Sequence, residues 1–222
     1  MTMRLQALRA KGSLNPTRLY LLRHGQVADG HTHLYHGHND VGLSPQGVEQ
    51  LERAAAQLKD VELAGVYTSD LSRAKVGAEI ICRGRNVKPQ ILAEFREVHF
   101  GAWEGLSFGE IMEQFPAAME ARFLDLPNFR IPGGESLGDV RARALAALKL
   151  LIEQHFEQAF LLVAHAGVNR VILSEALGLP MQNLFRLDQK YGCLNIIDYF
   201  PDLAVVRLIN GGVNGVGEGQ GG

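Results

Sequence analysis

The sequence predicts an α/β protein, a single three-layer α/β/α domain with a mostly parallel central sheet. Short apolar runs alternate with helical segments along the chain, the order that produces parallel strands covered by helices on both faces. The chain has 222 residues, of which 46% are hydrophobic. A compact chain of this size buries roughly 70% of its unfolded surface, enough for a core without disulfides. Neither an internal repeat nor a linker divides the sequence, so we expect one domain.

The first part of the chain contains two strand-and-helix pairs. The apolar run at 18–22 predicts a strand. Ser44 and Pro45 then predict the start of a helix, with serine as the N-cap and proline at the first helical position. The apolar run at 63–67 predicts a second strand, and a helix follows it because apolar residues recur there at helical spacing.

The middle of the chain is less regular. Short helices are expected at 108–114 and 117–124. Ser136 and Asp139, three residues apart, resemble a capping box, which predicts the start of a long helix.

The last part of the chain returns to the alternating order. Residues 160–164 predict a strand buried on both faces, and residues 168–177 predict the helix after it. Two further apolar runs, 194–199 and 204–209, predict a closing pair of strands.

Both ends of the chain are predicted to lie outside the fold. Residues 1–17 are basic but lack the apolar stretch of a secretory signal, so we expect a flexible arm. Residues 211–222 contain seven glycines in twelve positions, which cannot offset the entropy cost of ordering, so we expect a flexible tail. The folded domain is therefore predicted to span 18–210.

Composition excludes several classes of partner. The chain has 22 Lys and Arg against 24 Asp and Glu, a net charge of −2, which favours neither nucleic acid nor an anionic membrane surface. The sequence contains no run of 18 apolar residues, so no transmembrane helix is predicted. Two cysteines, Cys82 and Cys193, cannot form a disulfide framework, so a reducing, cytoplasmic location is expected.

Histidine and arginine side chains follow three of the predicted strands at the point where each strand ends. Arg23 and His24 follow the first strand, Arg73 comes shortly after the second, and His165 follows the strand at 160–164. Taken singly, each residue has an ordinary structural explanation. Together they would converge at one edge of a sheet, where ligand sites form. Such a cationic pocket suits a phosphoryl group, because guanidinium groups match phosphate oxygens.

Several segments resemble motifs of the histidine phosphatase superfamily, the phosphoglycerate-mutase-like enzymes. They occur in the family's order between about residues 18 and 209, nearly the whole ordered chain. The segments are Leu-Leu-Arg-His-Gly-Gln at 21–26, and those at 37–44, 67–74, 95–105, 132–136 and 163–167.

The resemblance implies roles for five residues. His24 would be the nucleophile and form a phosphohistidine, while Arg23, Arg73 and His165 would complete the phosphate pocket. Glu97 would protonate the leaving oxygen, so the catalytic set is His24, Glu97 and His165. The family needs neither a metal nor an organic cofactor, so none is expected.

The identity of the acid depends on the resemblance alone. A carboxylic acid suits the leaving group if burial raises its pKa towards the working pH. From the residues themselves, however, Glu97 cannot be distinguished from Glu94 or Glu104, and His99 is a further alternative.

Departures from the family pattern bear on the substrate. Many relatives have threonine at the position of Val27 and asparagine near Gly30, so two polar side chains of the phosphate site are missing here. The segment between Glu97 and His165 is also short compared with the mutases, which favours a phosphatase. The compact length and the motifs at 37–44 and 100–105 resemble the α-ribazole phosphatase branch of cobalamin synthesis.

Alternatives stay open. Within the family they are a phosphoglycerate mutase and a broad-specificity sugar phosphatase. From another class, a module that binds phosphorylated ligands without turnover is a third hypothesis. For the phosphatase the expected partner is a small phosphomonoester substrate, whereas the module without turnover would hold phosphorylated or protein ligands.

A histidine-rich segment suggests a metal site. Imidazole is the commonest transition-metal ligand. No other Asp, Glu, His or Cys cluster in the sequence has ligand spacing, and in the family this segment is a loop at the pocket rim, so we expect no metal. The segment contains four histidines in eight residues: His31, His33, His36 and His38.

Residues 95–132 are a candidate lid over the pocket. Phe123 and Phe129 are expected to be exposed there, where they would close the pocket or meet another subunit. A homodimer is therefore one possible assembly.

Overall fold

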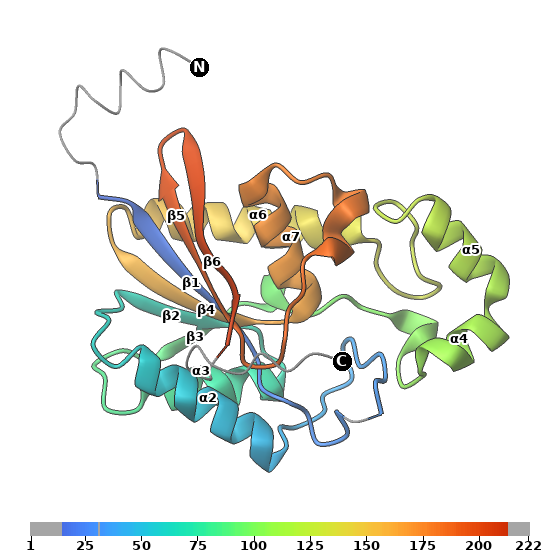
Figure 1. The fold of residues 1–222 in the computed structure, drawn as a ribbon, viewed down its shortest axis with the longest axis horizontal. Coiled ribbons are helices and arrows are strands. Elements are labelled where there is room, and N and C mark those ends of the chain that lie inside the picture. The colour runs from blue at the N-terminus through green and yellow to red at the C-terminus, as the bar shows by residue number, and fades with distance from the viewer. Residues whose placement is uncertain (1–14, 31, 213–222) are drawn as a thin grey trace.

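The computed structural model describes residues 15–30 and 32–212. Within this part of the chain, six strands form one sheet in the order β3-β2-β4-β1-β5-β6 (Figure 1). Every pairing among strands β1 to β4 is parallel, whereas β5 is antiparallel to β1 and β6 is antiparallel to β5. The predicted mostly parallel sheet is confirmed. The strands are β1 (Thr17–Arg23), β2 (Gly65–Thr68), β3 (Pro89–Ile91), β4 (Ala159–Ala164), β5 (Leu194–Phe200) and β6 (Leu203–Gly211).

Helices cover both faces of the sheet (Figure 1). Side chains of β1 alternate between two cores: Leu19 and Leu21 pack in the core that includes α6 and α7, and Leu22 packs in the core that includes α2 and α3. This alternation confirms the three-layer domain. The α-helices are α2 (Pro45–Gln57), α3 (Ser72–Cys82), α4 (Phe108–Gln114), α5 (Pro116–Leu124), α6 (Leu137–Gln154) and α7 (Ala166–Leu177). Short 3-10 helices are η1 (Ala93–Phe95), η2 (Gly101–Trp103) and η3 (Met181–Arg186).

The two predicted helix starts are confirmed by their capping contacts. Ser44 caps α2, its Oγ accepting the Gly47 N–H at 3.0 Å, and Pro45 is the first helical residue. Ser136 and Asp139 form a capping box at the start of α6. Each contact satisfies a backbone N–H that the first helical turn leaves free.

Two elements begin two residues from their predicted positions, and one strand was not predicted. Strand β2 begins at Gly65, two residues later than expected, and α7 begins at Ala166, two residues earlier. Strand β3 was not predicted at all. It is a three-residue edge strand with half-buried or exposed side chains, so it has no apolar alternation to reveal it.

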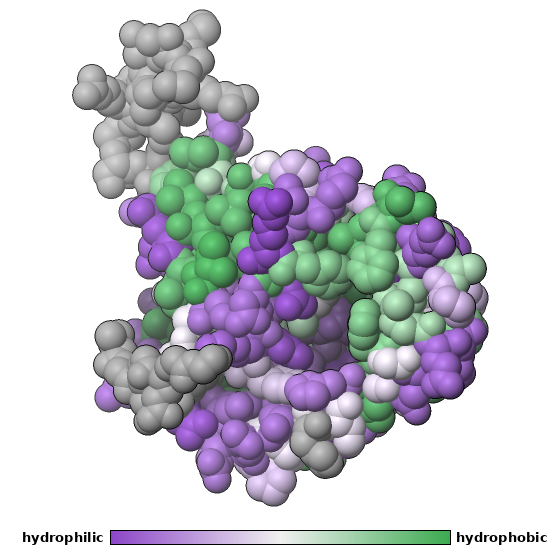
Figure 2. Space-filling view, turned by 45° about the vertical axis from the view of Figure 1, so that its right-hand side comes forward, coloured by the Kyte–Doolittle hydropathy of each residue, from purple (hydrophilic) through white to green (hydrophobic). Residues whose placement is uncertain are grey.

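The segment 95–132 contains η2, α4 and α5, and the two helices form a lobe beside the sheet (Figure 1). Figure 2 shows the surface hollowed next to a largely hydrophobic lobe on the right of the view. Phe123 is 66% exposed, as expected. The expectation for Phe129 was wrong: it is half-buried and stacks on Trp103, with ring centroids 6.0 Å apart. The action of this segment as a lid stays a prediction.

The ends of the fold extend slightly beyond the predicted domain. Strand β1 includes Thr17, and β6 includes Gly211. The remainder of the predicted arm before residue 15, and of the predicted tail after 212, lies outside the described residues. Among the helices that the structure describes, none combines the length and the apolar character needed to span a membrane.

Candidate active site

The register of the sheet places the two predicted site histidines side by side. Arg23 at the end of β1 lies opposite Ala164 at the end of β4, so His24 and His165 both leave the sheet at its carboxyl edge. The His24 N–H donates to the Ala164 carbonyl at 3.0 Å. The two imidazole rings lie 5.1 Å apart between centroids.

A cavity of about 410 Å³ opens at this edge. Four of the five predicted residues line it: Arg23, His24, Arg73 and Glu97. The fifth, His165, is completely buried and packs against His24. The structure therefore brings all five together. The other lining residues are His33, Leu34, Tyr35, His36, Gly37, Phe100, Phe108 and Tyr191.

His24 has one ring nitrogen available for attack. Its Nδ1 lies 2.7 Å from the Gly25 carbonyl oxygen. Because a carbonyl only accepts, Nδ1 carries the proton in this contact and Nε2 keeps its lone pair. Burial, followed by the charges of Arg23 and Arg73, holds the pKa of His24 well below its usual range. The imidazole is thus kept in the neutral, nucleophilic form.

Ser69 sets the orientation of His165. The Ser69 Oγ lies 2.7 Å from His165 Nε2 and accepts the Leu71 N–H at 3.4 Å, so its own proton is free to point at Nε2. When the hydroxyl donates to Nε2, the hydrogen of the neutral ring is on His165 Nδ1, which is buried and has no partner among the residues that the structure describes. Burial, and next the charge of Arg73, lowers the pKa of His165. The site thereby contains a neutral donor for an anion.

Backbone carbonyl groups hold Arg73 in place. Its Nη1 donates to the Asn39 carbonyl at 2.8 Å and its Nη2 to the Gly37 carbonyl at 2.6 Å. The side chain is 2% exposed. Since carbonyl oxygens carry no full charge, the guanidinium charge is left available for an anionic ligand.

Arg23 is held by a second set of contacts. Its Nη1 donates to the Gln189 carbonyl at 2.5 Å, and its guanidinium carbon lies 3.9 Å from the centroid of the Tyr191 ring. The Tyr191 ring also lies 5.6 Å from that of His24. The Arg23 Nε is buried without a partner within the described part of the chain. Such an unused donor beside His24 suits an anion.

Glu97 is the only carboxylate lining the cavity in the described residues. Its Oε1 accepts the N–H groups of Val98 at 2.9 Å and Gly167 at 3.1 Å. A Cβ on Gly167 would lie 2.4 Å from that oxygen, so only glycine permits this approach. The Gly167 N–H is shared with Oε2 at 3.2 Å. Oε1 therefore accepts two N–H groups and Oε2 only one, which leaves Oε2 with the greater capacity to carry a proton.

The three alternative acids lie elsewhere. Glu94 is exposed on η1. Glu104 accepts the N–H groups of His38 at 2.8 Å and Phe100 at 3.1 Å, a structural arrangement. His99 stacks on His38 with centroids 4.6 Å apart. None of the three lines the cavity.

The histidine-rich segment and the two departures from the family pattern also have defined places. His33 and His36 line the cavity, and His38 Nε2–H donates to the Glu97 carbonyl at 2.9 Å. His31 lies outside the described residues. Within residues 15–30 and 32–212, no three His, Cys, Asp or Glu side chains are grouped to hold a metal ion.

The two positions that depart from the family pattern lie outside the cavity lining. Val27 is 1% exposed, and neither it nor Gly30 lines the cavity.

Sequence reasoning missed several residues of the site. Ser69 lies within a quoted motif but carried no assignment. Gln189 and Tyr191 lie in a segment without a motif, and no pattern in the sequence distinguishes them. The contribution of Gly37 and Asn39 is made by backbone carbonyls, which any residue type provides.

The chain is similar to known phosphatases over nearly its whole described length. A family model described as Histidine phosphatase superfamily (branch 1) matches residues 19–211. The adenosylcobalamin/α-ribazole phosphatase of Escherichia coli strain K12 is 30% identical over 201 residues, covering 90% of this chain and 98% of that protein. The crystal structure of the α-ribazole phosphatase from Shigella flexneri gives a TM-score of 0.80 at 29% identity, covering 87% of this chain and 96% of that one. A mycobacterial glucosyl-3-phosphoglycerate phosphatase in complex with VO3 gives 0.78 at 28% identity, covering 88% and 99%.

Proposed function

This chain belongs to branch 1 of the histidine phosphatase superfamily, and from that membership we propose that it hydrolyses small phosphomonoesters through a phosphohistidine on His24. One observation carries the proposal: His24, with its proton on Nδ1, lines a cavity together with two arginines that have no carboxylate partner among the described residues. A phosphoryl group placed there meets both a nucleophile and fixed positive charge.

In the first proposed step, His24 Nε2 attacks phosphorus and the bond to the leaving oxygen breaks. Arg23, Arg73 and the Nδ1–H of His165 stabilise the charge on the equatorial oxygens, which is where most phosphoryl-transfer catalysis resides. The leaving oxygen takes a proton from Glu97, so an alcohol departs and a carboxylate remains. The positive charges are already in place, so they need no reorganisation during the reaction.

In the second proposed step, water replaces the alcohol. The Glu97 carboxylate takes a proton from the water as its oxygen attacks phosphorus, and the bond to His24 Nε2 breaks. Inorganic phosphate leaves, Glu97 is again protonated and His24 is again neutral. The cycle therefore closes without a metal ion or an organic cofactor.

For the leaving group, we propose a nucleoside-like alcohol such as that of α-ribazole 5′-phosphate. Three aromatic side chains line the cavity in addition to Tyr191: Tyr35 and Phe100, in edge-to-face contact with ring centroids 4.9 Å apart, and Phe108 from α4. Aromatic rings favour a flat apolar group by stacking. The similarity to α-ribazole phosphatases supports the same choice, whereas the mycobacterial relative makes a phosphorylated sugar acid the second candidate.

A rapid-quench experiment with p-nitrophenyl phosphate tests the covalent step. Acid-labile phosphate should be trapped on wild-type protein, and His24→Ala should trap none and lose nearly all turnover. Turnover without a trapped intermediate, or undiminished turnover by His24→Ala, would overturn the proposal. Complete absence of turnover with tight phosphate binding would instead favour the module that binds without catalysis.

A leaving-group comparison tests the role of Glu97. Glu97→Gln should lower kcat by about 10²- to 10⁴-fold with an alkyl phosphate, the range of general acid catalysis. With p-nitrophenyl phosphate the loss should be much smaller, because p-nitrophenolate departs without a proton. A phosphate-release screen with α-ribazole 5′-phosphate, 3-phosphoglycerate and sugar phosphates then ranks the substrates.

A further inference from the structure

We propose that Arg143 and Glu135 are positioning residues for Glu97, and that their ion pair sets the place from which Glu97 delivers its proton. Neither side chain lines the cavity, so both act through the backbone that carries Glu97. The inference rests on the proposed role of Glu97 as the acid.

The segment that carries Glu97 has little backbone support of its own. Residues 97–99 lie between η1 and η2, outside any helix or strand. Among the residues that the structure describes, their single backbone–backbone hydrogen bond joins the Glu135 N–H to the His99 carbonyl at 2.9 Å. Backbone groups without such partners need side chains or water to satisfy them. The position of Glu97 is thus set by side chains from other parts of the fold.

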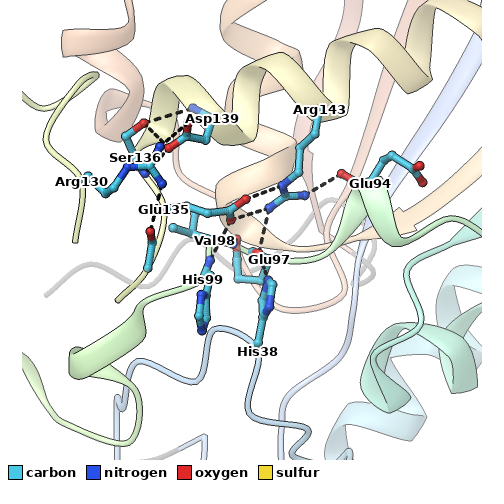
Figure 3. Close-up of polar contacts among 11 residues, drawn as sticks. His38, Glu94, Glu97, Val98, His99, Arg130, Glu135, Ser136, Asp139 and Arg143 are labelled. Carbon is cyan, nitrogen blue, oxygen red and sulfur yellow. Dashed lines mark hydrogen bonds and ion pairs between the residues drawn. The ribbon is translucent and has the colours of Figure 1, made fainter. Parts of the chain in front are cut away.

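His38 Nε2–H donates to the Glu97 carbonyl at 2.9 Å, and Arg143 on α6 holds that same carbonyl together with the carbonyl of Glu94 (Figure 3). The Arg143 Nη2 donates to the Glu97 carbonyl at 2.9 Å, and its Nη1 donates to the Glu94 carbonyl at 2.5 Å. One guanidinium thereby binds two backbone carbonyl groups that are three residues apart in the sequence. Because the guanidinium is planar and rigid, both carbonyls are held in a fixed relation to α6.

Glu135 fixes the direction of that guanidinium. Its Oε1 accepts from Arg143 Nε and its Oε2 from Arg143 Nη2, both at 2.9 Å, a two-point contact. The Oε2 also accepts the His99 N–H at 2.9 Å, two residues after Glu97. Both side chains of the pair are only 19% exposed. The pair consequently ties α6 to the chain on both sides of Glu97 (Figure 3).

Loss of the contacts that Arg143 and Glu135 make with residues 94–99 should affect proton delivery more than phosphate binding. The arginines and histidines that hold the phosphoryl group have separate supports, described above, and none of those supports involves Arg143 or Glu135. A displacement of about 1 Å in a reacting group can cost about 10²-fold in rate. The loss of rate should therefore appear mainly with substrates whose leaving group needs a proton.

Arg143→Met tests the inference, with Arg141→Met as its matched control. Arg141 lies two residues earlier on α6 and pairs with Glu175 at 2.6 Å, but it contacts no part of the Glu97 segment. We expect Arg143→Met to lower kcat by about 10- to 100-fold with an alkyl phosphate and by no more than about threefold with p-nitrophenyl phosphate. The control should change neither rate by more than about twofold.

A double variant separates positioning from a general weakening of the fold. In the Glu97→Gln background, Arg143→Met should add no more than about a threefold further loss with the alkyl phosphate, because residues acting through one group are not additive. Arg143→Lys keeps the charge but lacks the guanidinium fork, so we expect it to show the same difference between the two substrates. This variant decides whether Arg143 positions Glu97 if Arg143→Met fails to fold.

The outcomes distinguish this inference from the proposed function. If Glu97→Gln discriminates between leaving groups but the Arg143 variants lose equally on both, the positioning role is wrong and the role of Glu97 stands. Fully additive losses in the double variant have the same meaning. If Glu97→Gln itself does not discriminate, the proposed acid is wrong, and the positioning role falls with it.

Discussion

Replacing Ser69 by alanine should weaken both the stability and the activity of this protein, because Ser69 holds His165 in the proposed phosphate pocket. Ser69 and His165 are both completely buried, and their side chains meet at 2.7 Å. Without the hydroxyl, His165 Nε2 is a buried polar atom with no partner, which costs about 1–3 kcal/mol of the free energy of unfolding. For a domain of about 200 residues this corresponds to a Tm lower by roughly 2–12 °C.

The effect on catalysis follows from the orientation of the ring. When the Ser69 hydroxyl donates to His165 Nε2, the ring hydrogen is on Nδ1, where it can donate to a phosphate oxygen. A hydrogen bond to a charged group is worth about 1.5–3 kcal/mol. If Ser69→Ala loses most of this bond, kcat/KM should fall by about 10- to 100-fold, since each 1.4 kcal/mol is a factor of about ten.

Steady-state kinetics with p-nitrophenyl phosphate, vanadate inhibition and thermal unfolding would measure these effects. Ser174→Ala is the control, because Ser174 is also buried and its Oγ has no partner among the described residues. It should leave kcat/KM, vanadate affinity and Tm close to wild type. If Ser69→Ala lowers Tm but keeps wild-type kcat/KM and vanadate affinity, then Ser69 is purely structural and the reasoning about His165 is refuted.

Three further predictions concern pH, backbone packing and metals. Because the pKa of His24 lies well below its usual value near 6.5, this proposed nucleophile should stay unprotonated as the pH falls through 6.5. The kcat/KM should therefore decline only at lower pH, and an acid limb at or above 6.5 would contradict this. Gly25→Ala should cost about 3 kcal/mol or more in denaturant unfolding, because its Cβ would lie 2.1 Å from the Gly47 carbonyl oxygen, whereas Gly42→Ala, with open space around it, should be near neutral. Dialysis against EDTA should leave kcat/KM unchanged, and a loss that Zn²⁺ or Mn²⁺ restored would assign a metal role to the histidine-rich segment.

Much of the framework of the site could be predicted from local sequence. The apolar runs before His24 and His165 mark strands buried on both faces, and such strands need continuous apolar side chains. Ser44 and Ser136 mark helix starts because their hydroxyls satisfy backbone groups only two or three residues away. These signals depend on neighbours in the chain. Once both strands are placed in one parallel sheet, the convergence of the two histidines follows.

The choice and support of Glu97 as the proposed acid depend on the tertiary structure. Local sequence does not separate Glu97 from Glu94 or Glu104, since all three are carboxylates in an irregular segment. In the fold, Glu97 alone reaches the Gly167 N–H, which lies 70 residues away in the sequence, and Arg143, 46 residues away, holds its backbone. Contacts over such separations arise from how α6, α7 and this segment pack against one another. No pattern of neighbouring residues encodes that packing, because each partner is selected by distance in space and not by position along the chain.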